Sequence, residues 1–163
     1  MRLDSDYLYI LQQAEGYNRT ETKPICYNES VTDTLPRFTY MNPNDSNLVQ
    51  LRKHFNLDSI AGSGDEISKI KNLLYWVHNI VPHDGNSRNP EERNTIAMVE
   101  LCKKENRGVN CRMMAQMLNE CYLAMGFKSR FITCMPKVMI NDCHVINAVS
   151  YTHLRAHETS AHL

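Results

Sequence analysis

The amino-acid sequence predicts an α+β domain in which helices come first and strands follow. Three observations predict it: apolar residues at helical spacing over residues 67–81, a second such stripe over residues 111–125, and an alternating, β-prone segment over residues 128–134. A run of helices followed by a run of strands is typical of α+β proteins. The chain has 163 residues, which is one domain of ordinary size.

The first strong helix follows the breaker at residues 61–64. Ser63 and Glu66 have the S-x-x-E spacing of a capping box, which predicts the helix start, and Pro82 ends the apolar pattern. The large side chains of Tyr75 and Trp76 are expected to serve packing.

The remaining helices are weaker in the sequence. Residues 94–103 read as a second helix, and residues 48–55 have the spacing of one more. Between them, residues 83–87 read as a turn whose polar side chains face solvent. Residues 1–62 as a whole are rich in Pro, Asn, Asp, Ser and Thr, and are expected to be an accessory region of uncertain fold.

The most informative segment begins at Asn110, a suitable N-cap residue, and ends at Gly126, a suitable C′ residue. Its apolar stripe is expected to face the core and consists of Met114, Met117, Leu118, Cys121 and Met125. Residues 128–134 and 143–148 read as strands joined by a connection over residues 136–142. The predicted core domain therefore spans residues 63–148.

The tail, residues 149–163, is treated separately. Residues 149–159 resemble, letter for letter, one reading frame of a transposon-end adapter used in sequencing-library preparation. The resemblance implies that the natural protein departs from this sequence near Ala148, in the middle of a predicted strand. Segments of that origin are excluded from fold prediction, and the four-residue spacing of His153 and His157 is not interpreted as a metal site.

Composition limits the classes of function. Hydrophobic residues make up 42% of the chain and charged residues 22%, which indicates a folded globular protein. Lys+Arg and Asp+Glu both number 18, so no basic excess points to nucleic acid. No apolar run is long enough to span a bilayer. Residues 1–6 lack the apolar core of a signal peptide, which places the chain in the cytoplasm if Met1 is the natural start; the compartment is otherwise open, as is the oligomeric state.

Six cysteines occur without any CxxC pair, which disfavours a zinc ribbon or a thioredoxin-type motif. Most are expected to be small buried hydrophobic residues, although three disulfides would form in an oxidising compartment. Cys111 differs because it begins a helix, where the dipole and the unpaired N–H groups stabilise a thiolate and an oxyanion on a substrate. Gly108 is expected to let the chain turn sharply into this helix and to keep the sulfur accessible.

A thiolate nucleophile works with a histidine base, and His144 is the histidine that lies after Cys111 and before the tail. On a strand, His144 shares a face with Ile146 and Ala148. A helix, a strand and a connection separate it from Cys111, which is enough chain to return to the helix start. Each residue alone has an ordinary structural interpretation.

Together these residues resemble the core of the transglutaminase-like superfamily. The matching residues are Gly108 to Cys111, an apolar helix, then Gly126, Phe127, Arg130 and the apolar pair Phe131 and Ile132, then Cys143-His144-Val145. The helix over residues 67–81, with Trp76, is also similar to the helix before the family's cysteine. The resemblance covers residues 65–148.

The resemblance implies a papain-like fold, in which helices pack on an antiparallel sheet that is truncated here. It implies that Cys111 attacks the carbonyl of a peptide or protein substrate through a thioester, that His144 moves the proton, and that no cofactor takes part. The family's third residue, an Asp beyond the His, falls in the tail, so this chain is expected to be poorly active. Neither Asp142 nor Glu158 is assigned that role.

Three functions follow. The first is a cysteine hydrolase or acyltransferase, with proteolysis favoured over transfer. The second is a non-catalytic binding domain that keeps this scaffold. The third is a metal site formed by Cys134, Cys143 and His144, which lacks a fourth ligand; the sequence predicts no metal.

Overall fold

The computed structural model describes residues 38–135, 143–151 and 154–159. A compact unit extends from Thr39 to the end of the chain. The expectations for the first 37 residues and for the connection over residues 136–142, Asp142 included, lie outside the described residues.

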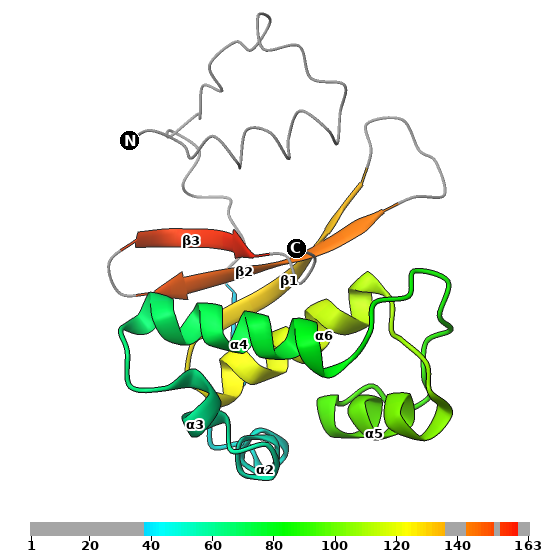
Figure 1. The fold of residues 1–163 in the computed structure, drawn as a ribbon. Helices are drawn as coiled ribbons and strands as arrows, with labels where there is room; N and C mark the ends of the chain where they lie inside the picture. Colours follow the sequence, from blue (N-terminus) through cyan, green and yellow to red (C-terminus); the bar gives the residue numbers. More distant parts are fainter. Residues whose placement is uncertain (1–37, 136–142, 152–153, 160–163) are drawn as a thin grey trace, which may run out of the picture. The chain divides into compact units, whose positions relative to one another are not determined.

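The unit combines helices with one antiparallel sheet (Figure 1). Its helices are α2 (Ser46–His54), α3 (Leu57–Ala61), α4 (Glu66–Ile80), α5 (Thr95–Glu105) and α6 (Cys111–Ala124). Its strands are β1 (Lys128–Cys134), β2 (His144–Tyr151) and β3 (Leu154–Thr159), in the order β1-β2-β3. The mixed class predicted from the sequence, with helices before strands, is confirmed.

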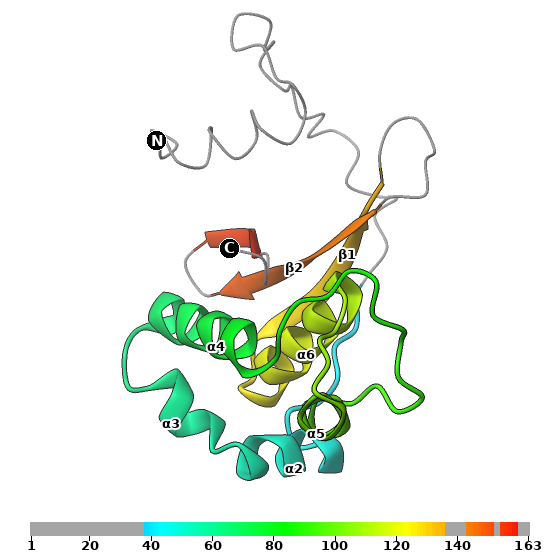
Figure 2. The same ribbon diagram turned by 45° about the vertical axis from the view of Figure 1, so that its right-hand side comes forward.

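Helix α6 is the centre of the fold. It packs against β1 and β2, and α2 and α4 pack against it in turn (Figures 1 and 2). The predicted apolar stripe is buried at Met114, Met117, Leu118 and Cys121. Tyr122 is also fully buried, and its hydroxyl donates to the Ile70 carbonyl at 3.2 Å, which ties α6 to α4. Gly126 ends the helical segment with φ of 84°, as expected for a C′ glycine.

Two predictions for α4 were wrong. The N-cap is Asp65, whose side chain accepts from the Ser68 amide at 2.7 Å, so the capping box at Ser63 does not form. An aspartate adds a negative charge at the positive end of the helix dipole, and the hydrogen bonds from Ser68 lower the pKa of Asp65. Tyr75 is 53% exposed because the buried face of α4 lies elsewhere. Trp76 does pack, with its ring 4.9 Å from that of Phe55.

Helices α2 and α3 belong to the same core as α4 and α6. The apolar side chains that they bury there are Leu48, Leu51, Leu57 and Ala61. Helix α2 was predicted; α3 was not, because five residues between Asn56 at φ 52° and Gly62 at φ 74° are too few for a periodic pattern. The compact unit therefore includes 24 residues, 39–62, that the sequence assigned to an accessory region.

The sheet continues through the segment that resembles the adapter. Strand β2 runs past Ala148 to Tyr151, and β3 pairs with it in antiparallel fashion, with Glu158 opposite Ala148. Strand β1 pairs along the other edge of β2, from Lys128 opposite Ser150 to Cys134 opposite His144. The tail thus supplies the third strand of the sheet.

Some features bear on the class of protein. No helix among the described residues is long and apolar enough to cross a membrane. The five cysteines of the described part of the chain are free thiols; Cys26 lies outside it. Over the same residues, no group of three His, Cys, Asp or Glu side chains comes together as a metal site would require.

Candidate active site

The N-terminus of α6 presents Cys111 as its first helical residue. Asn110 is the N-cap, as predicted: its Oδ1 accepts from the Met113 amide at 3.2 Å, and its carbonyl accepts from the Met114 amide at 3.0 Å. The amides of Cys111 and Arg112 have no acceptor within the part of the chain that the structure describes. Two N–H donors at the positive end of a helix therefore flank the thiol.

Cys111 is half-buried and lines an open cavity of about 270 Å³. The lining comes from three parts of the chain: the loop before α5, the start of α6 and the start of β2. Its residues are Gly85, Asn89, Asn110, Cys111, Arg112, Cys143 and Val145. The sulfur is thus neither sealed in the core nor on a flat surface.

The loop wall of this cavity is fixed to the segment that enters α6. A parallel bridge joins His83 to Val109, with the Val109 amide donating to the Pro82 carbonyl at 3.0 Å and the Asp84 amide donating to the Val109 carbonyl at 2.9 Å. The turn predicted at residues 83–87 is present, and the Ser87 amide closes it on the Asp84 carbonyl at 3.0 Å. The loop is therefore held next to Cys111 by backbone hydrogen bonds.

Gly108 allows this close approach. A Cβ atom at residue 108 would lie 2.6 Å from the Pro82 carbonyl oxygen and 2.9 Å from the Asp84 Cβ. Its φ is not in the positive region that favours glycine. The glycine is therefore needed because backbone packs against it, and not because of a positive φ.

Side-chain hydrogen bonds also hold the loop of the cavity wall against the segment that leads into α6. Asn110 Nδ2 donates to the Ser87 carbonyl at 3.1 Å and to Asn89 Oδ1 at 2.8 Å. Ser87 Oγ donates to the Gly108 carbonyl at 2.7 Å, and Arg107 donates to Ser87 Oγ and to the Arg88 carbonyl. One asparagine side chain therefore both caps α6 and holds the loop that forms the cavity wall.

His144 is the first residue of β2 and is exposed. Its two neighbours, Cys143 and Val145, both line the cavity with Cys111, whereas His144 is not among the lining residues. Val145 and Asn147 are buried, and Asn147 Nδ2 donates to the Ala115 carbonyl of α6 at 2.8 Å. Strand alternation then places His144 on the opposite face of β2. The start of β2 therefore reaches the cavity through the two neighbours of His144.

The other described cysteines differ in environment from Cys111. Cys121 is fully buried in the core, and burial raises the pKa of its thiol far above the ordinary value. Burial also raises the pKa of Cys102. Cys134 and Cys143 are exposed near the open end of the β1-β2 pair. The helical cysteines are therefore structural, as expected for small buried residues.

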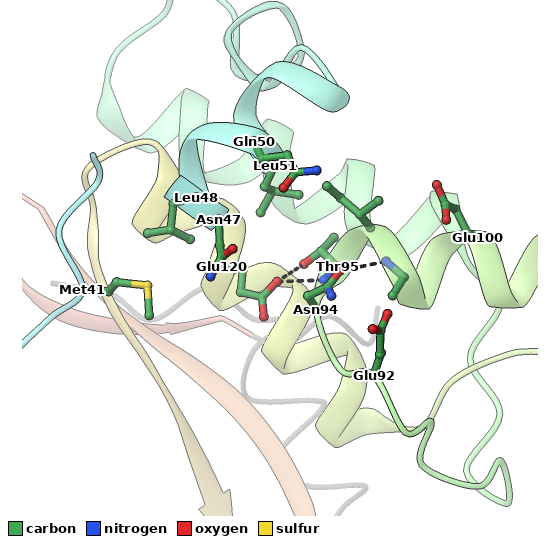
Figure 3. A pocket seen from close by; sticks show the side chains of 12 residues that line it. Met41, Asn47, Leu48, Gln50, Leu51, Glu92, Asn94, Thr95, Glu100 and Glu120 are labelled. Atoms are coloured by element: carbon green, nitrogen blue, oxygen red, sulfur yellow. Dashed lines mark hydrogen bonds between the residues drawn. The ribbon is translucent and has the colours of Figure 1, made fainter. Parts of the chain in front are cut away.

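A second cavity, of about 370 Å³, lies between α2, the start of α5 and α6 (Figure 3). Glu120 of α6 accepts there from the Thr95 amide at 2.8 Å and from the Thr95 hydroxyl at 2.6 Å (Figure 3). These bonds satisfy a free N–H at the start of α5. Its described lining includes neither cysteine nor histidine, so it offers no thiol–imidazole pair.

Sequence reasoning missed Arg112, Asn89 and Cys143 as residues of the cavity. Arg112 follows Cys111 directly, and Cys143 precedes His144, so both were adjacent to residues already singled out. Asn89 carried no signal, because its loop is placed by hydrogen bonds with residues about 20 positions away along the chain.

Comparisons with known proteins identify the fold. No family model and no curated protein matches the chain. A solved structure from Cytophaga hutchinsonii, described as a putative cysteine protease, matches with a TM-score of 0.51 and 16% sequence identity. The match covers 69% of this chain and 37% of that one, so this chain corresponds to about a third of that protein. At this identity the similarity concerns the fold alone, a mixed arrangement of helices and strands.

Proposed function

We propose that the chain contains the nucleophile half of a transglutaminase-like cysteine hydrolase or acyltransferase that acts on peptide or amide bonds, with proteolysis favoured. The observation that carries the proposal is the position of Cys111: it begins α6, opens on a cavity and lies beside two free backbone amides. The fold similarity to a protein described as a cysteine protease supports the same class.

In the proposed reaction, Cys111 Sγ attacks the carbonyl carbon of the substrate. The developing oxyanion accepts hydrogen bonds from the amides of Cys111 and Arg112. His144 accepts the proton of the Cys111 thiol and then delivers it to the nitrogen of the departing amine, which leaves a thioester on Cys111. Water or a second amine then resolves the thioester, which gives hydrolysis in the first case and transfer in the second.

The proposed reaction requires the His144 side chain to be close to Cys111. Its imidazole must reach Cys111 Sγ, although strand alternation places it on the other face of β2. His144 is the first residue of the strand, and both its neighbours line the cavity. The proposal therefore requires that the His144 ring turn toward Cys111 when a substrate binds.

The third catalytic residue is proposed to lie in natural sequence that replaces residues 149–163. A carboxylate orients the histidine in such triads, and its loss lowers activity by several orders of magnitude. This chain is therefore proposed to be poorly active, and a chain that continues with the natural sequence after Ala148 to be active.

Alkylation of the purified chain tests the nucleophile without requiring turnover. With iodoacetamide at neutral pH, we expect Cys111 to react at least about tenfold faster than Cys134, since its sulfur lies at a helix start, beside free backbone N–H groups, and opens on a cavity. Cys134 is the control because it is exposed but lies outside the cavity lining. We expect His144→Ala to slow Cys111 specifically. Equal rates at Cys111 and Cys134 would contradict the proposal.

The alternative is a non-catalytic binding domain on the same scaffold. The observation that favours it is the absence of His144 from the cavity lining. In that case His144→Ala leaves the alkylation rate of Cys111 unchanged, and extension of the chain past Ala148 with the natural sequence produces no thiol-dependent amidase activity.

A further inference from the structure

We propose that the cavity beside Cys111 selects substrates that carry a carboxylate close to the reacting carbonyl, and that Arg112 is the specificity-determining residue. This inference rests on the proposed function of Cys111 and names the substrate class for it. The carboxylate is that of an Asp or Glu side chain or of a free chain terminus; the two sources have the same chemistry.

Among the described residues that line the cavity, Arg112 is the only charged one. The other lining residues are a glycine, two asparagines, two cysteines and a valine. Asn89 and Asn110 supply neutral amide groups, and Asn110 Nδ2 is already engaged by the loop. Within the described lining, the electrostatic preference is therefore that of the Arg112 cation.

The guanidinium of Arg112 is available to a ligand. It is exposed and forms no hydrogen bond or ion pair with the residues that the structure describes. Other arginines are engaged: Arg52 pairs with Asp58 at 2.5 Å, and Arg107 is held by Ser87 and the Arg88 carbonyl.

Asp84 is the acidic residue in the turn that forms the cavity wall. It is not among the lining residues, and its Oδ1 accepts from the Asn86 amide at 3.0 Å. The Asp84 carboxylate is thus hydrogen-bonded within its own turn, and no carboxylate accompanies Arg112 among the described lining residues.

The position of Arg112 in the cavity is the basis of the proposed preference for a carboxylate. Arg112 and Cys111 line the same cavity, so a substrate whose carbonyl is bound at Cys111 would meet the Arg112 guanidinium there. A guanidinium donates two parallel hydrogen bonds to a carboxylate, which gives orientation as well as attraction. An amide flanked by a carboxylate is therefore held with its carbonyl at Cys111, whereas a cationic neighbour is repelled.

Two alkylating reagents test this without turnover. Iodoacetate carries a carboxylate and iodoacetamide does not, so the ratio of their rate constants at Cys111 reports the local charge. We expect Arg112→Gln to lower this ratio about fivefold, the effect of one nearby charge at a solvent-exposed site. Arg112→Lys should keep it within about twofold of the natural chain by the same Coulomb argument. Any change in thiolate content affects both reagents equally and cancels.

Lys128→Gln is the matched control, because it removes the same charge at the far end of β1, about 20 Å along the strand from Cys134. We expect it to leave the ratio unchanged. An unchanged ratio in Arg112→Gln would overturn the inference. The proposed nucleophile is judged separately, by the absolute rate of Cys111 relative to Cys134, so failure of one is distinguished from failure of the other.

Protection experiments identify the source of the carboxylate. Three blocked peptides are compared for their ability to slow alkylation by iodoacetamide: an amidated peptide with Glu, the same peptide with Gln, and the Gln peptide with a free C-terminus. Protection by the first assigns an acidic side chain, and protection by the third assigns a chain terminus. In Arg112→Gln, we expect protection by either peptide to disappear. Protection that persists in this variant would overturn the inference, and so would equal protection by all three peptides.

Discussion

Gly108→Ala is expected to loosen the wall of the Cys111 cavity. The new methyl group would lie 2.6 Å from the Pro82 carbonyl oxygen, 2.9 Å from the Asp84 Cβ and 3.1 Å from the Asp84 amide nitrogen. All three distances are shorter than a van der Waals contact of about 3.5 Å or more between such atoms. Two of these atoms are backbone, so the loop has to move away as a unit.

The expected loss in the free energy of unfolding follows from the hydrogen bonds that this movement breaks. The hydrogen bonds between Val109 and Pro82, at 3.0 Å, and between Asp84 and Val109, at 2.9 Å, both cross the gap that must widen. Each contributes about 1 kcal/mol, and overpacking adds about 1 kcal/mol or more. We therefore expect the free energy of unfolding to fall by about 2–3 kcal/mol, with a decrease in Tm of about 5–15 °C.

Urea unfolding followed by circular dichroism measures this change, and hydrogen exchange locates it. The amides of Val109 and Asp84 should lose protection before those of α6. Gly85→Ala is the matched control in the same loop, because the nearest atom to its new methyl group is His83 Cε1 at 3.9 Å. If the two variants were equally stable, the close packing around Gly108 would be refuted as its reason for being glycine.

Two further substitutions test the contacts that hold α6 in place. Asn147→Ala removes the hydrogen bond from Asn147 Nδ2 to the Ala115 carbonyl and leaves a small cavity at a fully buried site. We expect the free energy of unfolding, measured in urea, to fall by about 1–3 kcal/mol, and hydrogen exchange in β2 to become faster. Unaltered exchange would show that this bond does not anchor the strand. Glu120→Gln keeps the shape of the side chain but replaces the charged acceptor of two hydrogen bonds from Thr95. We expect the free energy of unfolding to fall by about 1 kcal/mol in this variant, and by more in Glu120→Ala. The opposite order would contradict a capping role for Glu120.

The sequence predicted those elements whose cause is local. Helix α6 carries its own N-cap at Asn110 and its own C′ glycine at Gly126, and β1 has the predicted bounds. Helix α4 was found from its apolar period, but its start was misplaced because both Ser63 and Asp65 are good N-cap residues. Local rules rank such candidates poorly when several stand within one turn.

What the sequence missed depends on contacts between distant residues. The loop that contains Asn89 is positioned by Asn110, and the face of β2 that meets α6 is fixed by Asn147. Neither contact leaves a periodic or spacing signal. The same limit applies to the candidate pair: the sequence placed Cys111 at a helix start, but the direction of His144 depends on which face of β2 packs on the helix.

Asn110 links the stability of the fold to the chemistry proposed for Cys111. Its Oδ1 caps α6 and so leaves only the amides of Cys111 and Arg112 free, while its Nδ2 holds the loop that walls the cavity. The sulfur, the proposed oxyanion donors and the cavity wall are therefore positioned by one side chain. Such an arrangement gives the proposed nucleophile fixed surroundings that do not depend on the position of the His144 side chain.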